Sequence, residues 1–185
     1  MRQPGDRDPA PGSLALVQDF VNTADLEGGS DFLRDTDEVV SFWVSHGGSK
    51  SDLSALTAED VAVCRDLRNA LRAACRAHAG VEVPLPSTLD ETFRQGPLVL
   101  RVNTSGDASL QPAPNLTRSS LVVATIAAAV FSAVAAGTWS RLKACAADPC
   151  QWVYYDRSPA GRSRWCTMAI CGSRAKMRTY RARTS

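Results

Sequence analysis

The sequence predicts a mainly α-helical protein of the α+β class, with a helical N-terminal domain and a small C-terminal finger held by metal. Apolar residues recur three and four apart through much of the first 140 residues, which is the spacing of amphipathic helices. Residues 98–112 instead hold two short runs around a Gly-containing turn, the pattern of a β-hairpin. Four of the six cysteines fall within residues 145–171. A chain of 185 residues is long enough for one well-cored domain and such an appendage.

The first twelve residues are polar and rich in Pro and Gly, so a flexible tail is expected over residues 1–12. No apolar run follows Arg2, and the tail therefore lacks the form of a signal peptide. Hydrophobic residues make up 44% and charged residues 22% of the chain, as in ordinary soluble proteins. We expect a cytoplasmic protein with reduced thiols, in which paired cysteines bind metal more often than they form disulfides.

Two short helices are expected before residue 50. Ser13 is a suitable N-cap for a helix over residues 14–22. Asp35 and Glu38 have the spacing of a capping box, and the helix that they open is expected to end at Gly47.

Thr57 and Asp60 form a second capping box, which opens the clearest helix of the sequence. Its apolar positions draw one stripe that contains Cys64 and Cys75, about three turns apart. We interpret both thiols as buried packing groups rather than redox groups. His78 ends the stripe and is interpreted as a helix-terminal residue rather than a metal ligand.

The predicted hairpin has strands over residues 98–102 and 108–112. A short helix opened by Ser87 is expected before it. The longest helix of the chain is expected after it, from its N-cap Thr117 to Trp139 or a little beyond.

This last helix contains nineteen residues, 121–139, without a charge, which meets the length criterion for a membrane span. Seven of the nineteen are alanine, and three more are Thr or Ser. The segment is therefore weakly hydrophobic for its length. We interpret it as a long Ala-rich central helix, packed closely by neighbours on several sides, and expect no association with a membrane.

The small net charge of +2 hides a strong asymmetry. From Arg141 to the end there are ten Lys and Arg against two Asp, a net charge of +8. Residues 1–140 carry eleven basic and seventeen acidic side chains, a net charge of −6. A basic segment on an acidic body is typical of a protein with a polyanionic partner.

The clustered cysteines form two pairs of equal spacing, Cys145-x4-Cys150 and Cys166-x4-Cys171. Four thiolates suit a closed tetrahedral zinc site of the structural kind. Disulfide pairing is the less favoured alternative in a reducing compartment. The fifteen residues between the pairs are expected to hold a strand and a turn, and metal binding must supply the folding free energy of so small a module.

Residues five apart on a regular α-helix point about 140° away from each other. Cys166 and Cys171 therefore cannot face one metal from an uninterrupted helix. We expect a break between them, with Gly172 making the turn and Ser173 capping a new helix from Arg174.

The last helix is basic on several faces and has little apolar stripe, so a nucleic-acid contact is expected there. Arginine forks fit phosphate oxygens and guanine edges, and a tyrosine can bond a phosphate or stack on a base. The alternative is a finger that binds RNA or an acidic protein surface, with Trp152, Tyr154 and Tyr155 available for stacking on single-stranded RNA. The expected DNA-binding residues are Arg162, Arg164, Ser173, Arg174, Lys176, Arg178, Tyr180, Arg181 and Arg183.

The segment from Cys145 to Arg183 resembles the CGNR zinc finger, whose Cys-Gly-Asn-Arg signature reads Cys-Gly-Ser-Arg at residues 171–174. The preceding body, with "LALVQDFVNT", "VVSFW" and "LRNALR", resembles the ABATE domain that accompanies this finger. The resemblance implies an ABATE-like domain over residues 13–140 and a finger over residues 141–185.

It also implies a bacterial stress-induced transcription regulator. One structural Zn²⁺ would be held by Cys145, Cys150, Cys166 and Cys171, and double-stranded DNA would be bound by Arg174 and the helix after it. The body would sense a small-molecule effector, form a homodimer, or both. Because Ser173 replaces the asparagine of the signature, helix capping is kept but base reading by an amide at this position is lost.

A ligand site in the body is a weaker expectation. Asp19 and Asn22 lie three apart on one helical face among apolar neighbours, and Arg68 is expected to pair with Asp19. Internal hydrogen bonding is the favoured alternative for these polar groups. We do not expect an enzyme, because the only histidines, His46 and His78, stand in no catalytic motif and a four-thiolate zinc has no open position.

Overall fold

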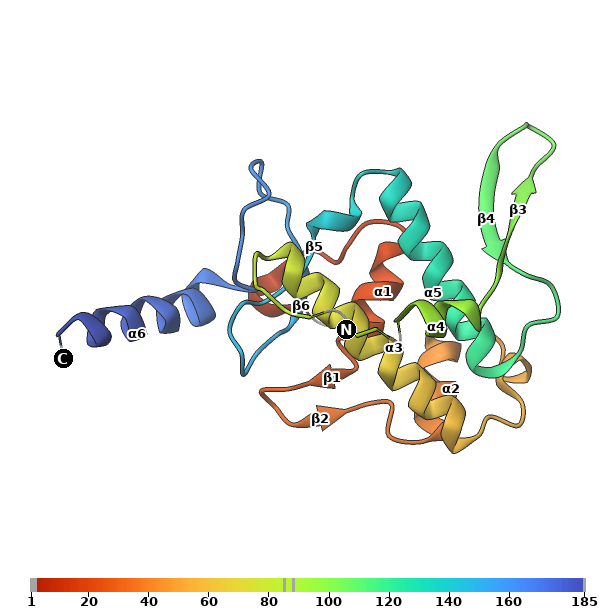
Figure 1. Cartoon of the computed structure of the whole chain (residues 1–185), viewed down its shortest axis with the longest axis horizontal. Coiled ribbons are helices and arrows are strands. Elements are labelled where there is room, and N and C mark those ends of the chain that lie inside the picture. Colours follow the sequence, from red (N-terminus) through yellow and green to blue (C-terminus); the bar gives the residue numbers. More distant parts are fainter. Residues whose placement is uncertain (1–2, 85, 88, 185) are drawn as a thin grey trace.

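The computed structural model describes residues 3–84, 86–87 and 89–184, and it confirms a mainly α-helical fold with short strands. Residues 1, 2 and 185 of the predicted tail and finger, and Thr88 of the predicted short helix, lie outside this part. Figure 1 shows a helical body with the C-terminal helix standing apart from it. The elements are η1 (Pro4–Asp6), α1 (Leu14–Val21), β1 (Ala24–Asp25), β2 (Ser30–Asp31), α2 (Thr36–Ser45), η2 (Lys50–Leu53), α3 (Ala58–His78), α4 (Leu89–Arg94), β3 (Leu98–Val102), β4 (Ala108–Pro112), α5 (Arg118–Ala135), η3 (Trp139–Arg141), β5 (Leu142–Ala144), β6 (Val153–Tyr155), the π-helical turn η4 (Met168–Gly172) and α6 (Ser173–Thr184).

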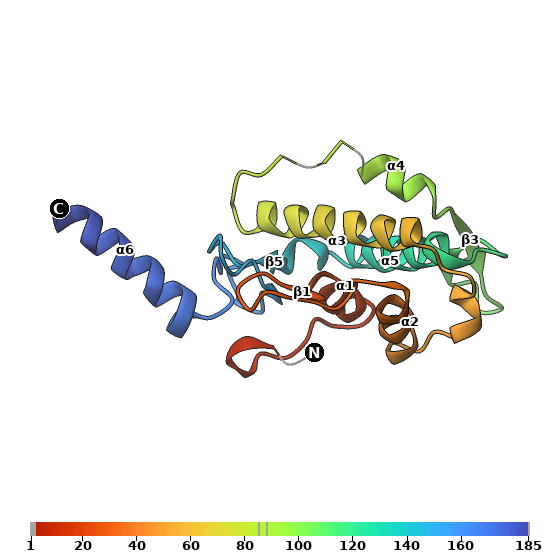
Figure 2. The same ribbon diagram turned by 90° about the horizontal axis from the view of Figure 1, so that it is seen from below.

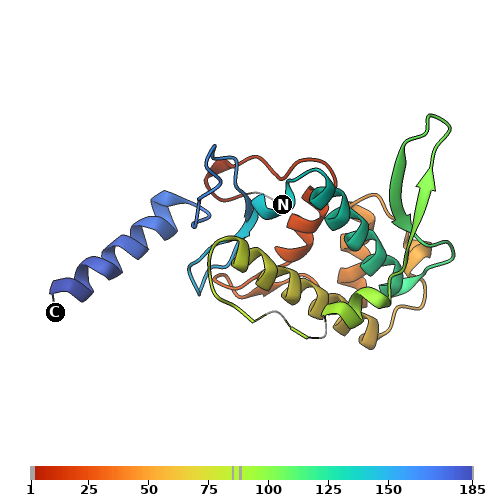
Figure 3. The same ribbon diagram turned by 45° about the horizontal axis from the view of Figure 1, so that its top comes forward.

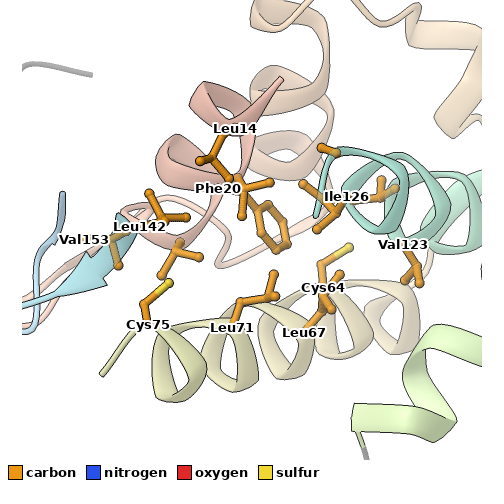
Figure 4. Packing of buried hydrophobic residues seen from close by; sticks show 14 of the residues in the cluster. Leu14, Phe20, Cys64, Leu67, Leu71, Cys75, Val123, Ile126, Leu142 and Val153 are labelled. Atoms are coloured by element: carbon orange, nitrogen blue, oxygen red, sulfur yellow. The ribbon is translucent and has the colours of Figure 1, made fainter. Parts of the chain in front are cut away.

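The core of the body lies where α1, α3 and α5 meet. Phe20 of α1 points between Leu71 of α3 and Ile126 of α5, and all three side chains are almost fully buried (Figure 4). Leu142 and Val153 of the β5–β6 hairpin enter the same cluster (Figure 4). The first part of the finger therefore belongs to the hydrophobic core of the body.

The capping predictions for the first helices are confirmed only in part. The Asp35 carboxylate accepts a hydrogen bond from the Glu38 N–H at 3.0 Å, as a cap of α2 should. Glu38 completes no box, because its carboxylate accepts from the backbone N–H of Arg34 instead. The prediction for Ser13 is wrong: Ser13 has helical dihedral angles and its hydroxyl makes no capping bond, because the turn begins earlier, at Pro11.

The long helix α3 is as predicted. Thr57 and Asp60 form a complete capping box, and the helix ends at His78. Cys64 and Cys75 are fully buried in the core, and burial raises the pKa of each thiol to about 12. Neither thiol is therefore ionised at neutral pH, which fits a packing role.

Helix α5 is shorter than predicted, and Thr117 makes no side-chain capping bond. The helix ends at Ala135 because Gly137 takes a left-handed conformation, with φ +66°, and Trp139 then lies in a 3₁₀ turn. One face packs on α1 and α3, but Phe131 and Val134 are about half exposed, so neighbours do not surround the whole helix. Among the described residues α5 alone has the length and apolar character of a membrane span, and its packing in the core supports the core interpretation.

The β3–β4 hairpin is antiparallel, as predicted, with Leu98 opposite Pro112 and Val102 opposite Ala108. It projects from the body beside α5, at the end of the molecule opposite to α6 (Figure 3). The preceding helix α4 begins at Leu89, after the predicted cap Ser87.

The segment expected to be a flexible tail packs against the finger and α1 between residues 3 and 10. Gln3 and Ala10 are buried, and Gln3 Oε1 accepts a hydrogen bond from Trp152 Nε1 at 3.1 Å. A side chain at Gly5 would stand 2.9 Å from Thr167 Cγ2, so the backbone approaches the finger closely there. These contacts join segments that are distant in the sequence, and the polar composition of the segment does not predict them.

Candidate metal centre and nucleic-acid interface

The four clustered cysteines meet at one point of the finger. Their Sγ atoms all lie within 4.8 Å of one another, and each residue is buried. The Cys166 sulfur lies 3.7 Å from that of Cys150 and 3.6 Å from that of Cys171. The structure therefore brings together the whole set of metal ligands predicted from the sequence.

This arrangement fits a zinc ion. Zn–S bonds of about 2.3 Å in a tetrahedron place the sulfurs about 3.8 Å apart. The Cys150–Cys166 and Cys166–Cys171 sulfur separations of 3.7 and 3.6 Å are close to that value. Because four soft thiolates complete a tetrahedron by themselves, the site is of the closed, structural kind and fits one structural Zn²⁺.

Each cysteine is positioned by a different piece of local structure. Cys145 directly follows β5, and its N–H donates to Trp152 O at 2.9 Å. Cys150 closes a tight turn, with its N–H donating to Ala147 O at 3.0 Å. Cys166 lies in a bend of the chain just before η4, and Cys171 lies inside the turn η4.

The predicted break between Cys166 and Cys171 is wrong in its details. The helix begins just after Cys166, where the Thr167 hydroxyl caps it by accepting from the Ile170 N–H at 3.2 Å. It then runs through a π-helical turn directly into α6. Ser173 is no cap, since it lies inside the helix and its hydroxyl donates to Met168 O at 3.1 Å. Cys166 lies before this helix and Cys171 lies inside it, so the two cysteines do not face the site from one uninterrupted helix, as predicted.

Gly172 makes no turn, and it is required for a different reason. A Cβ at this position would lie 2.8 Å from the Met168 sulfur and 3.3 Å from Trp165 Cδ1. The glycine thus lets Met168 and Trp165 pack over the helix beside the metal site.

The thiols of the cluster influence one another. Hydrogen bonds from the Cys150 and Cys166 thiols lower the pKa of Cys145. Hydrogen bonding to Cys145 in turn raises the pKa of Cys150 and of Cys166, and burial raises that of Cys171. A bound Zn²⁺ replaces the remaining protons, so metal binding releases protons and weakens at low pH.

A buried ion pair fixes the loop between the cysteine pairs. Lys143 Nζ donates to Asp156 Oδ2 at 2.9 Å and also to Gly161 O. Asp156 accepts from the backbone N–H groups of Ser158 and Ser163 at 3.0 and 2.9 Å. Burial opposes ionisation of Asp156, but these hydrogen bonds outweigh it and hold its pKa well below the usual value.

The finger is also bonded to the body. Asn22, directly after α1, donates from Nδ2 to Val153 O and accepts the Val153 N–H at Oδ1, both at 2.8 Å. Its amide therefore pairs with β6 as a neighbouring strand would. Gln18 Nε2 donates to the same carbonyl at 3.2 Å, and Arg76 pairs with Asp148 at 2.6 Å.

The β5–β6 hairpin forms a wall between two cores. Val153 and Tyr155 face the core of the body, whereas Tyr154 faces the cysteine cluster. This follows from the alternation of side chains along a strand.

Helix α6 stands clear of the body. It continues directly from η4 and extends away from the finger (Figure 2). Residues 173–183 are exposed or half-exposed and include no acidic residue. Its exposed basic side chains are those of Arg174, Lys176, Arg178, Arg181 and Arg183.

The other predicted DNA-binding residues are more dispersed. Tyr180 is exposed on α6, whereas Ser173 uses its hydroxyl within the helix. Arg162 and Arg164 are exposed on the loop after β6. That loop leaves the finger in a different direction from α6 (Figure 1).

The residues predicted for a ligand site do not share one site. The side-chain amide of Asn22 is hydrogen-bonded to the backbone of Val153. Arg68 donates to the Asp31 carboxylate at 2.6 and 3.1 Å, rather than to Asp19 as expected. Asp19 lies 3.2 Å from His46 Nε2, at the edge of a surface hollow. Sequence reasoning did not foresee the bonds of Asn22 to Val153, which join residues 131 positions apart.

A closed four-cysteine site in a small hairpin module, joined to a helical body, defines a zinc-finger protein. Residues 141–184 match the family described as "CGNR zinc finger", and residues 14–137 match the ABATE family, described as "Putative stress-induced transcription regulator". Because the second match covers more than half of the chain, the protein belongs to the ABATE family and carries a C-terminal CGNR zinc finger. No curated protein matches the chain.

Proposed function

We propose that this protein is a zinc-dependent regulator of transcription that binds double-stranded DNA through α6. The observation that carries the proposal is the free-standing basic helix, whose position is fixed by the metal site at its N-terminal end. A helix of 12 residues is about 18 Å long and 10–12 Å wide, which suits the major groove of B-DNA. An isolated helix of this length is marginal in water, so the zinc site and the DNA would both stabilise it.

The charge distribution supports the same partner. Five basic side chains on α6 have no acidic neighbour within the helix. They alternate with exposed Met177 and Tyr180, which can contact bases or sugars. About five phosphate contacts give a log–log salt slope of roughly −4 to −5.

The burial of aromatic side chains supports duplex DNA over single-stranded RNA. Tyr154 and Tyr155, which RNA binding would use for stacking, are buried in the two cores. Trp152 is half-buried and bonded to Gln3. Stacking on successive bases needs exposed aromatic rings, whereas Tyr154 and Tyr155 are buried and Trp152 is half-buried and hydrogen-bonded.

The test measures DNA binding by fluorescence anisotropy over a range of salt concentrations. The double variant Arg178→Ala/Arg181→Ala should bind at least about tenfold more weakly and lower the salt slope by about 2. A matched control, Lys50→Ala/Arg101→Ala, removes two exposed basic side chains of the body and should change neither quantity. A flat salt response of the zinc-loaded protein, equal losses in both double variants, or preference for single-stranded RNA in competition would refute the proposal.

The two matched families are described as a regulator and a zinc finger, and we propose no catalytic activity. A homodimer and a cytoplasmic location stay predictions from the sequence. Sedimentation velocity, with and without DNA, tests the first.

A further inference from the structure

One face of α6 forms a groove of about 500 Å³ that begins at η4 and follows the helix. Its lining residues are apolar, hydroxyl-bearing or basic, and none of them is acidic. The residues on which the inference rests are Ile170, Arg174, Met177, Arg178 and Arg181. We call it the α6 groove.

Two large apolar side chains lie in the α6 groove and are open to solvent. Ile170 is 48% and Met177 is 52% exposed. A single exposed apolar residue is normal on a protein surface, but these two share one groove. Together they form a small apolar patch that a partner can cover.

Arginines stand on both sides of this patch. Arg174 precedes Met177 by three residues, and Arg181 follows it by four. The rise of an α-helix places Arg174 and Arg181 about 10 Å apart along the axis, with Met177 between them. The major groove of B-DNA is about 12 Å wide. Arginines at this spacing can reach phosphates at the edges of the groove while Met177 faces the bases on its floor.

Arg174 has a partner within the protein that DNA can replace. It forms an ion pair with Glu27 of the β1–β2 turn. The two side chains are 54% and 42% exposed, and an ion pair so open to solvent contributes little stability. A phosphate can therefore take the place of Glu27 at small cost.

The composition of the α6 groove favours DNA over a lipid surface. Helices that lie on membranes carry a broad apolar face with Trp, Phe or Leu. Among the lining residues of this groove, Ile170 and Met177 are the only large apolar ones. The C5-methyl group of thymine is the apolar group that base edges present in the major groove, and it is small enough for such a patch.

We propose that the α6 groove recognises thymine in the major groove, through contact of Met177 with the C5-methyl group. Ile170 extends the same apolar contact towards the finger, and Arg174, Arg178 and Arg181 bind the phosphates beside it. The inference rests on the proposed function. It specifies which face of α6 meets the bases and which base that face prefers.

The test compares two duplexes that differ only in the methyl group: alternating A–T DNA, and the same DNA with deoxyuridine in place of thymidine. Full-length zinc-loaded protein is titrated with each duplex by fluorescence anisotropy over a range of salt concentrations. A fully buried methyl group is worth about fourfold in affinity, so wild type should bind the thymine duplex about two- to fourfold more tightly. The salt slope should be equal for both duplexes, because their phosphates are the same.

Variants of α6 assign the preference to a side chain. Met177→Ala should bind both duplexes equally and keep the salt slope of wild type, since it removes no charge. Alanine is the best helix former, so this variant should fold as wild type does by circular dichroism. Met177→Leu, which keeps an apolar side chain of similar size, should retain the preference for thymine.

Two control variants lie outside the α6 groove. Tyr180→Ala changes a residue of another groove on α6, and Leu100→Ala removes an apolar side chain that is 66% exposed on the β3–β4 hairpin. Both should keep the preference for thymine. Because the hairpin lies at the end of the molecule opposite to α6, Leu100→Ala should also keep the affinity of wild type (Figure 3).

The outcomes separate this inference from the proposed function. Equal binding of the two duplexes by wild type, or a preference that is lost in Tyr180→Ala but kept in Met177→Ala, would overturn the inference and leave DNA binding intact. Absence of salt-dependent binding to both duplexes would instead refute the proposed function, and the inference with it. Release of the DNA by phosphatidylglycerol vesicles at equal phosphate concentration would identify the groove as a lipid site and also overturn the inference.

Discussion

Replacing Asn22 by alanine tests whether the finger and the body fold as one unit. The Asn22 side chain is fully buried, and both of its polar atoms bond the backbone of Val153 at 2.8 Å. In Asn22→Ala the Val153 carbonyl keeps its bond from Gln18, but the Val153 N–H is left buried and without a partner. An unpaired buried group costs about 1–3 kcal/mol, and the second lost bond costs about 1 kcal/mol. The variant should therefore be destabilised by about 2–4 kcal/mol.

For a protein of this size, each kcal/mol lowers Tm by about 2–4 °C, so a decrease of about 4–16 °C is expected for Asn22→Ala. Circular dichroism of the zinc-loaded protein, in thermal and urea unfolding, gives both quantities. The control is Asn69→Ala, since Asn69 is exposed on α3 and its loss should change stability by less than about 0.5 kcal/mol. If Asn22→Ala unfolds within that same margin of wild type, the hairpin is not held by α1 and the reasoning is refuted.

The variant Asn22→Asp adds a test with a defined pH dependence. The introduced carboxyl group can still donate to Val153 O while it is protonated, but once ionised it faces that carbonyl with a buried charge. Its folded-state pKa should therefore be raised above the unfolded value of about 3.9. Below about pH 4 the carboxyl group is protonated in both the folded and the unfolded state, and the variant should be more stable than Asn22→Ala. As pH rises towards the raised pKa, this advantage should be lost. An advantage that does not change with pH would contradict the hydrogen-bond geometry.

Three further predictions concern the thiols and a helix cap. Cys166→Ser, or chelation of zinc, should remove most of the ellipticity of α6 and lower the Tm of the body as well, whereas Cys64→Ser should keep one zinc per chain by elemental analysis. In native zinc-loaded protein, iodoacetamide should leave Cys64 and Cys75 unmodified at pH 7.5 by mass spectrometry, because burial raises the pKa of both thiols to about 12. Asp60→Asn should cost about 1–2 kcal/mol at pH 7. Burial opposes ionisation of Asp60, but bonds from Ser119 and Thr57 lower its pKa, so the cost should shrink as pH falls below about 4, as measured by urea unfolding.

Local signals in the sequence are sufficient to predict several elements of the structure. The box of Thr57 and Asp60 is complete within four residues, and it forms as predicted because nothing distant competes with it. The metal ligands follow from spacing for a similar reason, since four thiols crowded into 27 residues have few other uses in a reduced protein.

Other signals are overridden by the surroundings. Ser13 and Ser173 are both good capping residues, yet each lies in helical chain because an earlier residue starts the helix. In the finger that residue is Thr167, which directly follows the metal ligand Cys166. The sequence predicts a turn at Gly172, but the missing Cβ of this residue serves the packing of Met168. A glycine in the sequence is compatible with a turn and with close packing, and only the tertiary structure shows which of the two roles it has.

Long-range polar contacts could not be predicted at all. The bonds of Asn22 to Val153, of Lys143 to Asp156 and of Arg174 to Glu27 depend on which segments the fold brings together. A polar residue in an apolar stripe indicates only that some partner exists. In the case of Asn22 the favoured alternative, an internal partner, is what the structure shows.

The shared hairpin has a consequence for regulation. Because Val153 and Tyr155 belong to the core of the body and Tyr154 to the cysteine cluster, we expect a change in either core to affect the other through one short strand. A separate finger on a flexible linker could not transmit such a change. Loss of zinc should therefore loosen the body. The β5–β6 hairpin, which stabilises the finger, would thus also make the proposed DNA binding respond to the conformation of the body.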